Sequence, residues 1–268
     1  MKYIKALEFS IKEHWKNKSL ILQLAIADSK KQTIRTSLGI IWLYIRDITY
    51  FIVYTLFRIL VAGNGKVNGI SAILYVVLGL VPWLFISDVL NKGSTVIKSN
   101  KSIVKSIAFP TTILPTAEVI CIFIQKIFNL GVAFAITLIM EGGAGISIIG
   151  IIYYVLAMIC LMICINSITS AFVAISGDFQ QCYLAIIKVL IYALPVIWSF
   201  DRISNFKIVF ALKLNPMVYV VEGFRNSFTR GFVFDVKYTL YFWGVLLLLL
   251  LISSYTQHKL SEFYSDLM

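Results

Sequence analysis

Charged side chains interrupt two of the long apolar runs in this sequence. Arg46 and Asp47 are adjacent in one run, and Glu118 and Lys126 lie two helical turns apart in another. Charge inside hydrocarbon is costly, so such residues default to functional roles. Arg46 and Asp47 could screen one another, mark a water-filled path, or lie at the headgroups with the arginine extended to the surface. Glu118 and Lys126 suit ion pairs across helices as well as they suit a role in transport.

Aromatic side chains crowd the same run as Arg46. Tyr50, Tyr54 and Phe57 follow i, i+4, i+7 spacing, which places the three rings on one face of a helix. Because aromatic faces stack on sugar rings and tolerate a sliding chain, these residues are candidates for a sugar-conducting lining. The alternative interpretation, an interfacial belt with core packing, accounts for most aromatic residues in the chain.

Signatures of ATP hydrolysis and of catalysis are missing from the sequence. No G-x-x-x-x-G-K-[ST] phosphate loop is present, and Lys92-Gly93-Ser94 has the letters in the wrong order. The two histidines, His14 and His258, fall in the flanks, and no D-x-D motif is available to hold a sugar-nucleotide metal ion. We therefore predict no catalytic residue, no metal site and no cofactor bound by this chain. Any ATP and Mg²⁺ used for transport would bind to a partner polypeptide.

The composition indicates which solvent these elements face. The chain has 268 residues, of which 59% are hydrophobic and 14% charged, against about half and a quarter in a soluble domain. Apolar runs of about 20 residues match the thickness of a bilayer, and they do not alternate as barrel strands would. We predict an all-α membrane protein. The net charge of +11 then favours contact with anionic lipid over binding of nucleic acid.

The apolar runs predict six spans with two distinctive flanking segments. The expected spans cover about 38–62, 70–90, 116–140, 146–175, 182–200 and 238–254. Residues 1–36 form a basic, cytoplasmic amphipathic segment that lies on the membrane surface, because apolar side chains recur there at helical spacing. A signal peptide is the alternative for this segment, but its apolar stretch is short and Gln23 breaks it. The six-span domain is expected to cover 37–268.

Positive charges orient the predicted spans. With both termini in the cytoplasm, the inside holds eight basic residues before Leu38 and four in a polar loop at 91–106. The outer segment 201–236 carries a basic group that weakens the rule. A segment that dips back into the membrane would explain this group, with Asn215-Pro216 as the break between two short apolar pieces. Within it, Glu222 and Arg225 are spaced for an i, i+3 ion pair.

Five motifs in register resemble one family along nearly the whole chain. They are Arg35-Thr-Ser-Leu-Gly-Ile-Ile-Trp42, Tyr75-Val-Val-Leu-Gly-Leu-Val-Pro-Trp83, Phe109-Pro110 with Pro115, Leu214-Asn-Pro-Met217, and Glu222-Gly-Phe-Arg225. Together they resemble the membrane subunit of ABC-2 type exporters of teichoic acids, O-antigens, capsules and rhamnose-rich wall polymers. One departure is the pair Arg46-Asp47, where relatives often carry a proline, so the shape and polarity of the channel entrance differ here.

The resemblance implies a partner set and a place in the cell. It implies a homodimer of six-span subunits in the bacterial cytoplasmic membrane, two copies of a separate ATP-binding subunit, and an undecaprenyl-linked polysaccharide as substrate. It implies that the N-terminal helix and the 91–106 loop contact the ATPase, for which Lys98, Asn100 and Lys101 are candidates. It also implies re-entrant helices before the last span.

Three functions remain open from the sequence. The leading hypothesis is export of a lipid-linked polysaccharide between two permease subunits, lined by aromatic residues of the first and fifth spans such as Tyr50, Tyr54, Tyr192 and Trp198. The second is an ABC-2 exporter of drugs or small lipids. The third is a glycan-modifying membrane enzyme, which would need an acid or base from the outer carboxylates Glu141, Asp201, Glu222 and Asp235.

Overall fold

A computed structural model describes residues 2–34, 39, 41–101 and 109–261. The described chain is helical and contains no β-strand, so the prediction of an all-α fold is confirmed. Within the described residues, ten α-helices have eight or more residues: α1 (Lys2–Lys16), α2 (Lys18–Ile34), α3 (Ile41–Ala62), α4 (Ala72–Lys92), α7 (Leu114–Glu141), α8 (Ile148–Ile175), α9 (Gly177–Ala193), α10 (Phe206–Lys213), α11 (Pro216–Thr229) and α12 (Val236–Ser261). Shorter helical segments are η1 (Gly93–Thr95), α5 (Val96–Ser99), η2 (Thr111–Ile113) and η3 (Phe200–Arg202).

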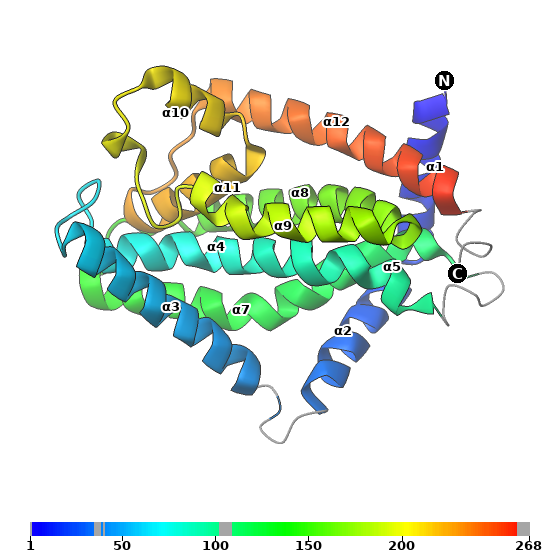
Figure 1. The fold of residues 1–268 in the computed structure, drawn as a ribbon, viewed down its shortest axis with the longest axis horizontal. Coiled ribbons are helices and arrows are strands. Elements are labelled where there is room, and N and C mark those ends of the chain that lie inside the picture. The colour runs from blue at the N-terminus through cyan, green and yellow to red at the C-terminus, as the bar shows by residue number, and fades with distance from the viewer. Residues whose placement is uncertain (1, 35–38, 40, 102–108, 262–268) are drawn as a thin grey trace.

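The long helices form a bundle around α4. Figure 1 shows α4, α7, α8 and α9 running side by side, with α12 along one side of the bundle and α1 crossing the C-terminal end of α12. Helix α4 is buried along most of its length, because α3, α7, α8 and α11 all pack against it. In Figure 1, α2 and α3 lie on the side of the bundle opposite α12, and both slant downward in the view. The described chain begins and ends near the same end of the bundle.

Helix ends coincide with residues that suit them. Ser71, Ser147 and Ser176 each precede a helix, and each side-chain hydroxyl accepts a hydrogen bond from a backbone N–H in the first turn. Helix α7 ends at Gly142, whose φ of 64° is a left-handed conformation that glycine adopts without strain. These caps fix the lengths of α4, α7 and α8, and therefore the positions of the side chains that they carry.

In the part of the chain that the structure describes, four helices are long and apolar enough to cross a membrane: α4 with its continuation to Ser99, η2 with α7, α8, and α12. They correspond to the second, third, fourth and last of the expected spans. Helix α3 carries Arg46, Asp47 and Arg58, and α9 has 17 residues, so neither meets the same criteria. The count of six spans therefore stays a prediction, while a multi-pass membrane protein is supported.

The predicted bounds of the fifth span are wrong at its C-terminal end. Helix α9 begins at Gly177 and ends at Ala193, and Leu194 is extended, with φ −101° and ψ 144°. The cause is Pro195, since a proline clashes with a helical conformation of the residue before it. Trp198, expected on this span, consequently lies in the irregular segment after the helix.

The flanking segments are more helical than expected. The N-terminal segment forms two helices, α1 and α2, and α2 packs along α7. The expected polar loop at 91–106 continues α4 through η1 and α5 as far as Ser99, and residues 102–108 lie outside the described part. In the outer segment, α10 and α11 are separated at Asn215, with Pro216 as the first residue of α11, so the predicted break is present. Their insertion into a membrane stays a prediction.

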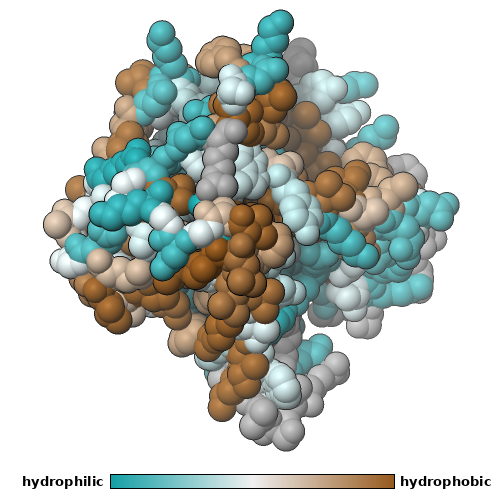
Figure 2. All heavy atoms as spheres, turned by 60° about the vertical axis from the view of Figure 1, so that its left-hand side comes forward, coloured by the Kyte–Doolittle hydropathy of each residue, from teal (hydrophilic) through white to brown (hydrophobic). Residues whose placement is uncertain are grey.

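Large hydrophobic side chains remain uncovered on α3 and α9. Leu60 is 84% exposed, and other exposed hydrophobic side chains on the two helices include Ile52, Val53, Leu56, Phe57, Val61, Ile186, Val189 and Tyr192. Figure 2 shows hydrophobic side chains gathered over the lower centre of the molecule, while hydrophilic side chains gather toward its left and right margins. An apolar face of this kind requires lipid or another protein as its neighbour.

Candidate functional site: a charged cluster beside an aromatic groove

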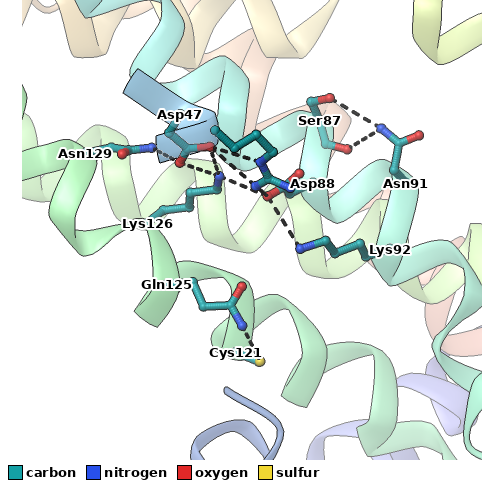
Figure 3. Close-up of polar contacts among 10 residues, drawn as sticks. Asp47, Ser87, Asp88, Asn91, Lys92, Cys121, Gln125, Lys126 and Asn129 are labelled. Atoms are coloured by element: carbon teal, nitrogen blue, oxygen red, sulfur yellow. Dashed lines mark hydrogen bonds and ion pairs between the residues drawn. The ribbon is translucent and has the colours of Figure 1, made fainter. Parts of the chain in front are cut away.

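A buried carboxylate on α3 is the centre of a polar cluster that joins three helices. Asp47 accepts hydrogen bonds from Lys126 Nζ at 2.9 and 2.7 Å and from Asn129 Nδ2 at 2.8 Å, both on α7. Figure 3 shows these side chains pointing toward one another from α3 and α7. The side chains of Asp47 and Lys126 are 2% and 6% exposed, so the pair is removed from solvent. A buried ion pair of this kind requires further hydrogen bonds, which Asn129 supplies.

A second carboxylate, Asp88 on α4, extends the cluster toward the surface. Lys126 Nζ lies 2.9 Å from Asp88 Oδ2, so one ammonium group bridges two carboxylates on different helices. Arg46 Nη2 donates to the same oxygen at 2.7 Å, and Lys92 Nζ lies 3.9 Å away. Three cations and two carboxylates leave the cluster with one net positive charge.

The cluster holds α3 in place. Helix α3 packs mainly on α4 and less on α7, and much of its remaining surface is apolar and exposed. Arg46 and Asp47 contribute the polar links from α3 to both neighbours. Mutual screening, one of the roles left open for these two residues, is limited to a weak direct contact of 3.4 Å. Both residues instead pair across helices, a role that the sequence did not predict for them. Lys126 likewise pairs across helices.

A groove of about 410 Å³ opens beside the cluster, between α3, α4 and α9. Its charged lining consists of Arg46, Asp88, Lys92 and Lys188. Its aromatic lining consists of Tyr50, Tyr54 and Trp83, and the rings of Tyr50 and Tyr54 stack with centroids 6.1 Å apart. Among the described residues, the exposed Lys188 has no ion-pair partner. The groove therefore combines aromatic faces with a net positive wall.

The groove contains only some of the residues predicted for a channel lining. Tyr50, Tyr54 and Arg46 line it, whereas Phe57 and Tyr192 are exposed outside it on α3 and α9. Trp198 does not reach it: the indole Nε1 donates to Tyr192 O at 3.1 Å, and the ring packs edge-on against Phe200. A lining formed by one protein chain therefore excludes Phe57, Tyr192 and Trp198.

Sequence reasoning missed four residues of this site. Trp83 and Asp88 lie in the second span, and Lys92 was assigned to the loop after it. Asn129 lies in the same apolar run as Lys126 and was not singled out as a site residue. A signal existed for Asp88 and Lys92, because they lie at i, i+4 on one helix face and Asp88 is a charge inside a span. For Trp83, nothing in the sequence distinguishes a residue that lines a groove from one that packs in the core.

The predicted ion pair between Glu222 and Arg225 is wrong. The buried guanidinium of Arg225 instead donates to three backbone carbonyls, to Pro195 O at 2.7 Å, to Val196 O at 3.2 Å and to Tyr75 O at 3.2 Å. It also lies over the Tyr75 ring, 3.7 Å from the centroid. The irregular chain after α9 leaves carbonyls without helical partners, and a guanidinium with several donors is suited to satisfy them. Arg225 thus ties α11 to α4 and to the end of α9.

Glu222 lies on α11 without an ion pair to Arg225. Burial raises the pKa of the Glu222 carboxyl above its ordinary value, and the nearby Arg225 and Lys213 oppose that rise. The Asn215 side chain caps α11 through the N–H of Met217, as expected for the residue before a first-turn proline. The predicted break at Asn215-Pro216 is therefore a helix start.

The residues predicted to contact an ATPase lie at one end of the bundle. Lys98 Nζ donates to Gln180 Oε1 at 3.2 Å, Asn100 Nδ2 donates to Val96 O at 2.9 Å, and Lys101 is exposed. Beneath them is a polar cleft of about 520 Å³ between α2, α7 and the α4–α5 segment. The cleft is lined by Asp28, Lys31, Lys92, Thr95, Val96, Ser99, Asn100 and Glu118.

No metal centre accompanies this site in the part of the chain that the structure describes. There, no three His, Cys, Asp or Glu side chains are grouped closely enough to hold a metal ion. What the cluster and the groove can do is attract an anion, stack on rings and hold three helices together.

The fold and the site define a class: a helical, multi-pass membrane protein with a charged and aromatic groove on its side. Comparison with known proteins is more specific. No family model matches the chain. A curated relative is the O-antigen export system permease protein RfbA of Myxococcus xanthus, which is 20% identical over 219 residues, 81% of this chain and 83% of the relative. This relative confirms the resemblance to permeases of ABC-2 type polysaccharide exporters.

Proposed function

We propose that this chain is the permease subunit of an ABC transporter that exports a lipid-linked surface polysaccharide across the bacterial cytoplasmic membrane. The polymer is a teichoic acid, an O-antigen or a rhamnose-rich wall polymer carried on undecaprenyl pyrophosphate. A separate ATPase binds ATP and Mg²⁺ and drives the transport. This chain itself performs no chemical step.

The groove between α3, α4 and α9 is the observation that carries this proposal. Tyr50, Tyr54 and Trp83 offer ring faces on which sugars stack. Arg46, Lys92 and Lys188 outnumber the single carboxylate of the lining, Asp88, so the groove favours an anionic ligand. A sugar chain joined to phosphate has both chemistries. A purely hydrophobic drug would offer no counter-charge to this net positive lining, in which Lys188 has no ion-pair partner among the described residues.

A homodimer gives this groove a second wall. The exposed apolar side chains on α3 and α9 flank the groove, and a second copy of the same face would cover them. Phe57 and Tyr192, which lie outside the groove of one chain, would then contribute to the enclosed path. Two ATPase copies would act at the end of the bundle that carries Lys98, Asn100 and Lys101, against α1, α2 and the polar cleft.

Depletion of the protein in its native host tests the proposal. Surface polymer and undecaprenyl-linked polymer inside the cell are measured after the supply of the protein is stopped. Loss of surface polymer with accumulation of the lipid-linked form inside supports export. Unchanged surface polymer with no internal accumulation would refute it. An altered sugar composition with normal export would favour the glycan-modifying enzyme.

The partner and the substrate class are tested on the purified protein. An ATP-binding subunit in equal copy number should co-purify, and its ATP hydrolysis should rise with a glycan lipid added in detergent. Stimulation by hydrophobic drugs and not by glycan lipids would favour the drug exporter. Purification without any nucleotide-binding protein would argue against an ABC transporter of either kind.

A further inference from the structure

A second groove, of about 380 Å³, lies between α1, α8 and α12 and contains no residue of the charged cluster. Its apolar lining is Leu7, Ile11, Ile163 and Leu250, and its polar lining is mostly small: Ser10, Thr112, Ser167, Ser253 and Ser254, with His14 and Gln257. Trp15 and Lys18 complete the lining. Two of its walls, α8 and α12, are candidate membrane spans, while α1 crosses them at their end (Figure 1).

Helix α1 is held over this groove by contacts with the bundle. His14 Nε2 lies 2.9 Å from Thr116 Oγ1 on α7, and His14 Nδ1 lies 2.8 Å from Ser10 O on α1 itself. Ala6 is buried where α1 packs on α12. Helix α1 also leaves Ile4, Ile11 and Trp15 exposed, and the last two line the groove. An amphipathic helix with exposed apolar side chains is suited to the headgroup boundary of a bilayer.

The rim of the groove combines a cation with an aromatic ring. Lys18 Nζ lies 4.8 Å from the centroid of the Trp15 ring, and both side chains are exposed. Tryptophan and lysine are the side chains that anchor proteins at the level of lipid headgroups. The depth of the groove is apolar with hydroxyl groups, which suits an acyl chain and the glycerol part of a lipid.

We propose that this groove binds one anionic glycerophospholipid of the cytoplasmic leaflet. An acyl chain lies between α8 and α12, and the phosphate lies at Lys18 beside Trp15. The charge of the rim argues for an anionic lipid, since each basic residue near the surface attracts it measurably. The walls argue for a lipid and not for a protein segment, because α8 and α12 are both long and apolar enough to cross a membrane. The site is separate from the glycan groove. The proposal of a bound lipid does not depend on which polymer is exported.

Native mass spectrometry of the full-length protein in mild detergent tests this site. The protein is stripped of co-purified lipid and titrated with dioleoylphosphatidylglycerol or with dioleoylphosphatidylcholine. We expect one phosphatidylglycerol per chain to be retained about tenfold more tightly than phosphatidylcholine. Equal retention of the two lipids, or no retained lipid at all, would overturn the proposal.

Charge reversals on the N-terminal segment locate the headgroup. Lys18→Glu should weaken retention of phosphatidylglycerol at least tenfold and leave phosphatidylcholine unchanged. Lys5→Glu makes the same change of charge on α1 at an exposed residue outside the groove, so it should change retention less than threefold. Equal losses in the two variants would mean diffuse attraction to a basic surface and would refute a defined site.

A filling variant tests the acyl position. Ser254→Phe places a ring in the groove and should expel both lipids, whereas Leu247→Phe, at an exposed position of the same helix outside the groove, should expel neither. Binding that survives Ser254→Phe in folded protein would place the lipid elsewhere. If Ser254→Phe fails to fold, the comparison of Lys18 with Lys5 still decides.

Discussion

Replacing Asp47 by asparagine removes the central carboxylate of the charged cluster at nearly constant volume. Lys126 then keeps Asp88 at 2.9 Å, but its two contacts of 2.9 and 2.7 Å to Asp47 are lost. Breaking a buried ion pair by neutralising one partner costs about 3–5 kcal/mol. Because Lys126 retains one carboxylate, we expect the lower limit, about 3 kcal/mol. In a chain of this size that corresponds to a fall of roughly 6–12 °C in the denaturation midpoint.

The assay is thermal denaturation of the purified protein in detergent, followed as a double-mutant cycle. Lys126→Gln alone leaves two carboxylates without their shared cation. The double variant Asp47→Asn with Lys126→Gln should be less destabilised than the sum of the singles, by about 1–3 kcal/mol. The control is Glu8→Gln, which breaks the exposed pair between Glu8 and Lys12 and should leave the midpoint unchanged. Additive singles, or a midpoint for Asp47→Asn equal to that of the wild type, would refute the role of the cluster.

Three further predictions concern the contacts around α11. Arg225→Lys should destabilise the protein by about 2 kcal/mol in the same assay, because an ammonium group cannot both satisfy three carbonyls and stack on Tyr75. A variant as stable as the wild type would contradict this. Gly223→Ala should lower the free energy of unfolding by about 1–3 kcal/mol, because the new Cβ would overlap the Tyr154 ring. The control Gly131→Ala in α7 places its Cβ in open space and should be neutral or stabilising. Equal effects of the two substitutions would refute the close packing at Gly223. Burial raises the pKa of Glu222 above its ordinary value of 4.5, so the stability that this residue contributes is present below that value and is lost as pH rises through the raised pKa. Glu222→Gln should therefore gain stability relative to the wild type as pH rises above 4.5, and a gain independent of pH would contradict the assignment.

Composition and apolar runs predicted the all-α membrane fold because a bilayer permits few solutions. Backbone groups in hydrocarbon must bond within the segment, and runs of the right length then become helices. The end of α9 was also readable in principle, since Leu194 precedes Pro195 and helices tend to end there. The predicted span failed because hydrophobicity continues past the proline, and apolar character was given more weight than backbone geometry.

The site was only half predictable, because its partners come from helices distant in sequence. Arg46, Asp47 and Lys126 were found as charges inside apolar runs, but nothing local in the sequence pairs Asp47 with Lys126 or reveals that Lys126 also contacts Asp88. Arg225 shows the reverse case. Its spacing from Glu222 suggested a local ion pair, whereas the unsatisfied carbonyls at Pro195 and Val196, created by the end of α9, bind the guanidinium more favourably.

The central claim is that a glycan passes along the groove between α3, α4 and α9. A photoreactive phenylalanine analogue in place of Tyr54, irradiated in cells that make the polymer, tests this claim most directly. The matched control places the same analogue at Leu248, an exposed position on α12 away from the groove. We expect a protein adduct that carries polymer sugars for Tyr54 and none for Leu248. Absence of sugar from the Tyr54 adduct, or equal labelling at both positions, would contradict it.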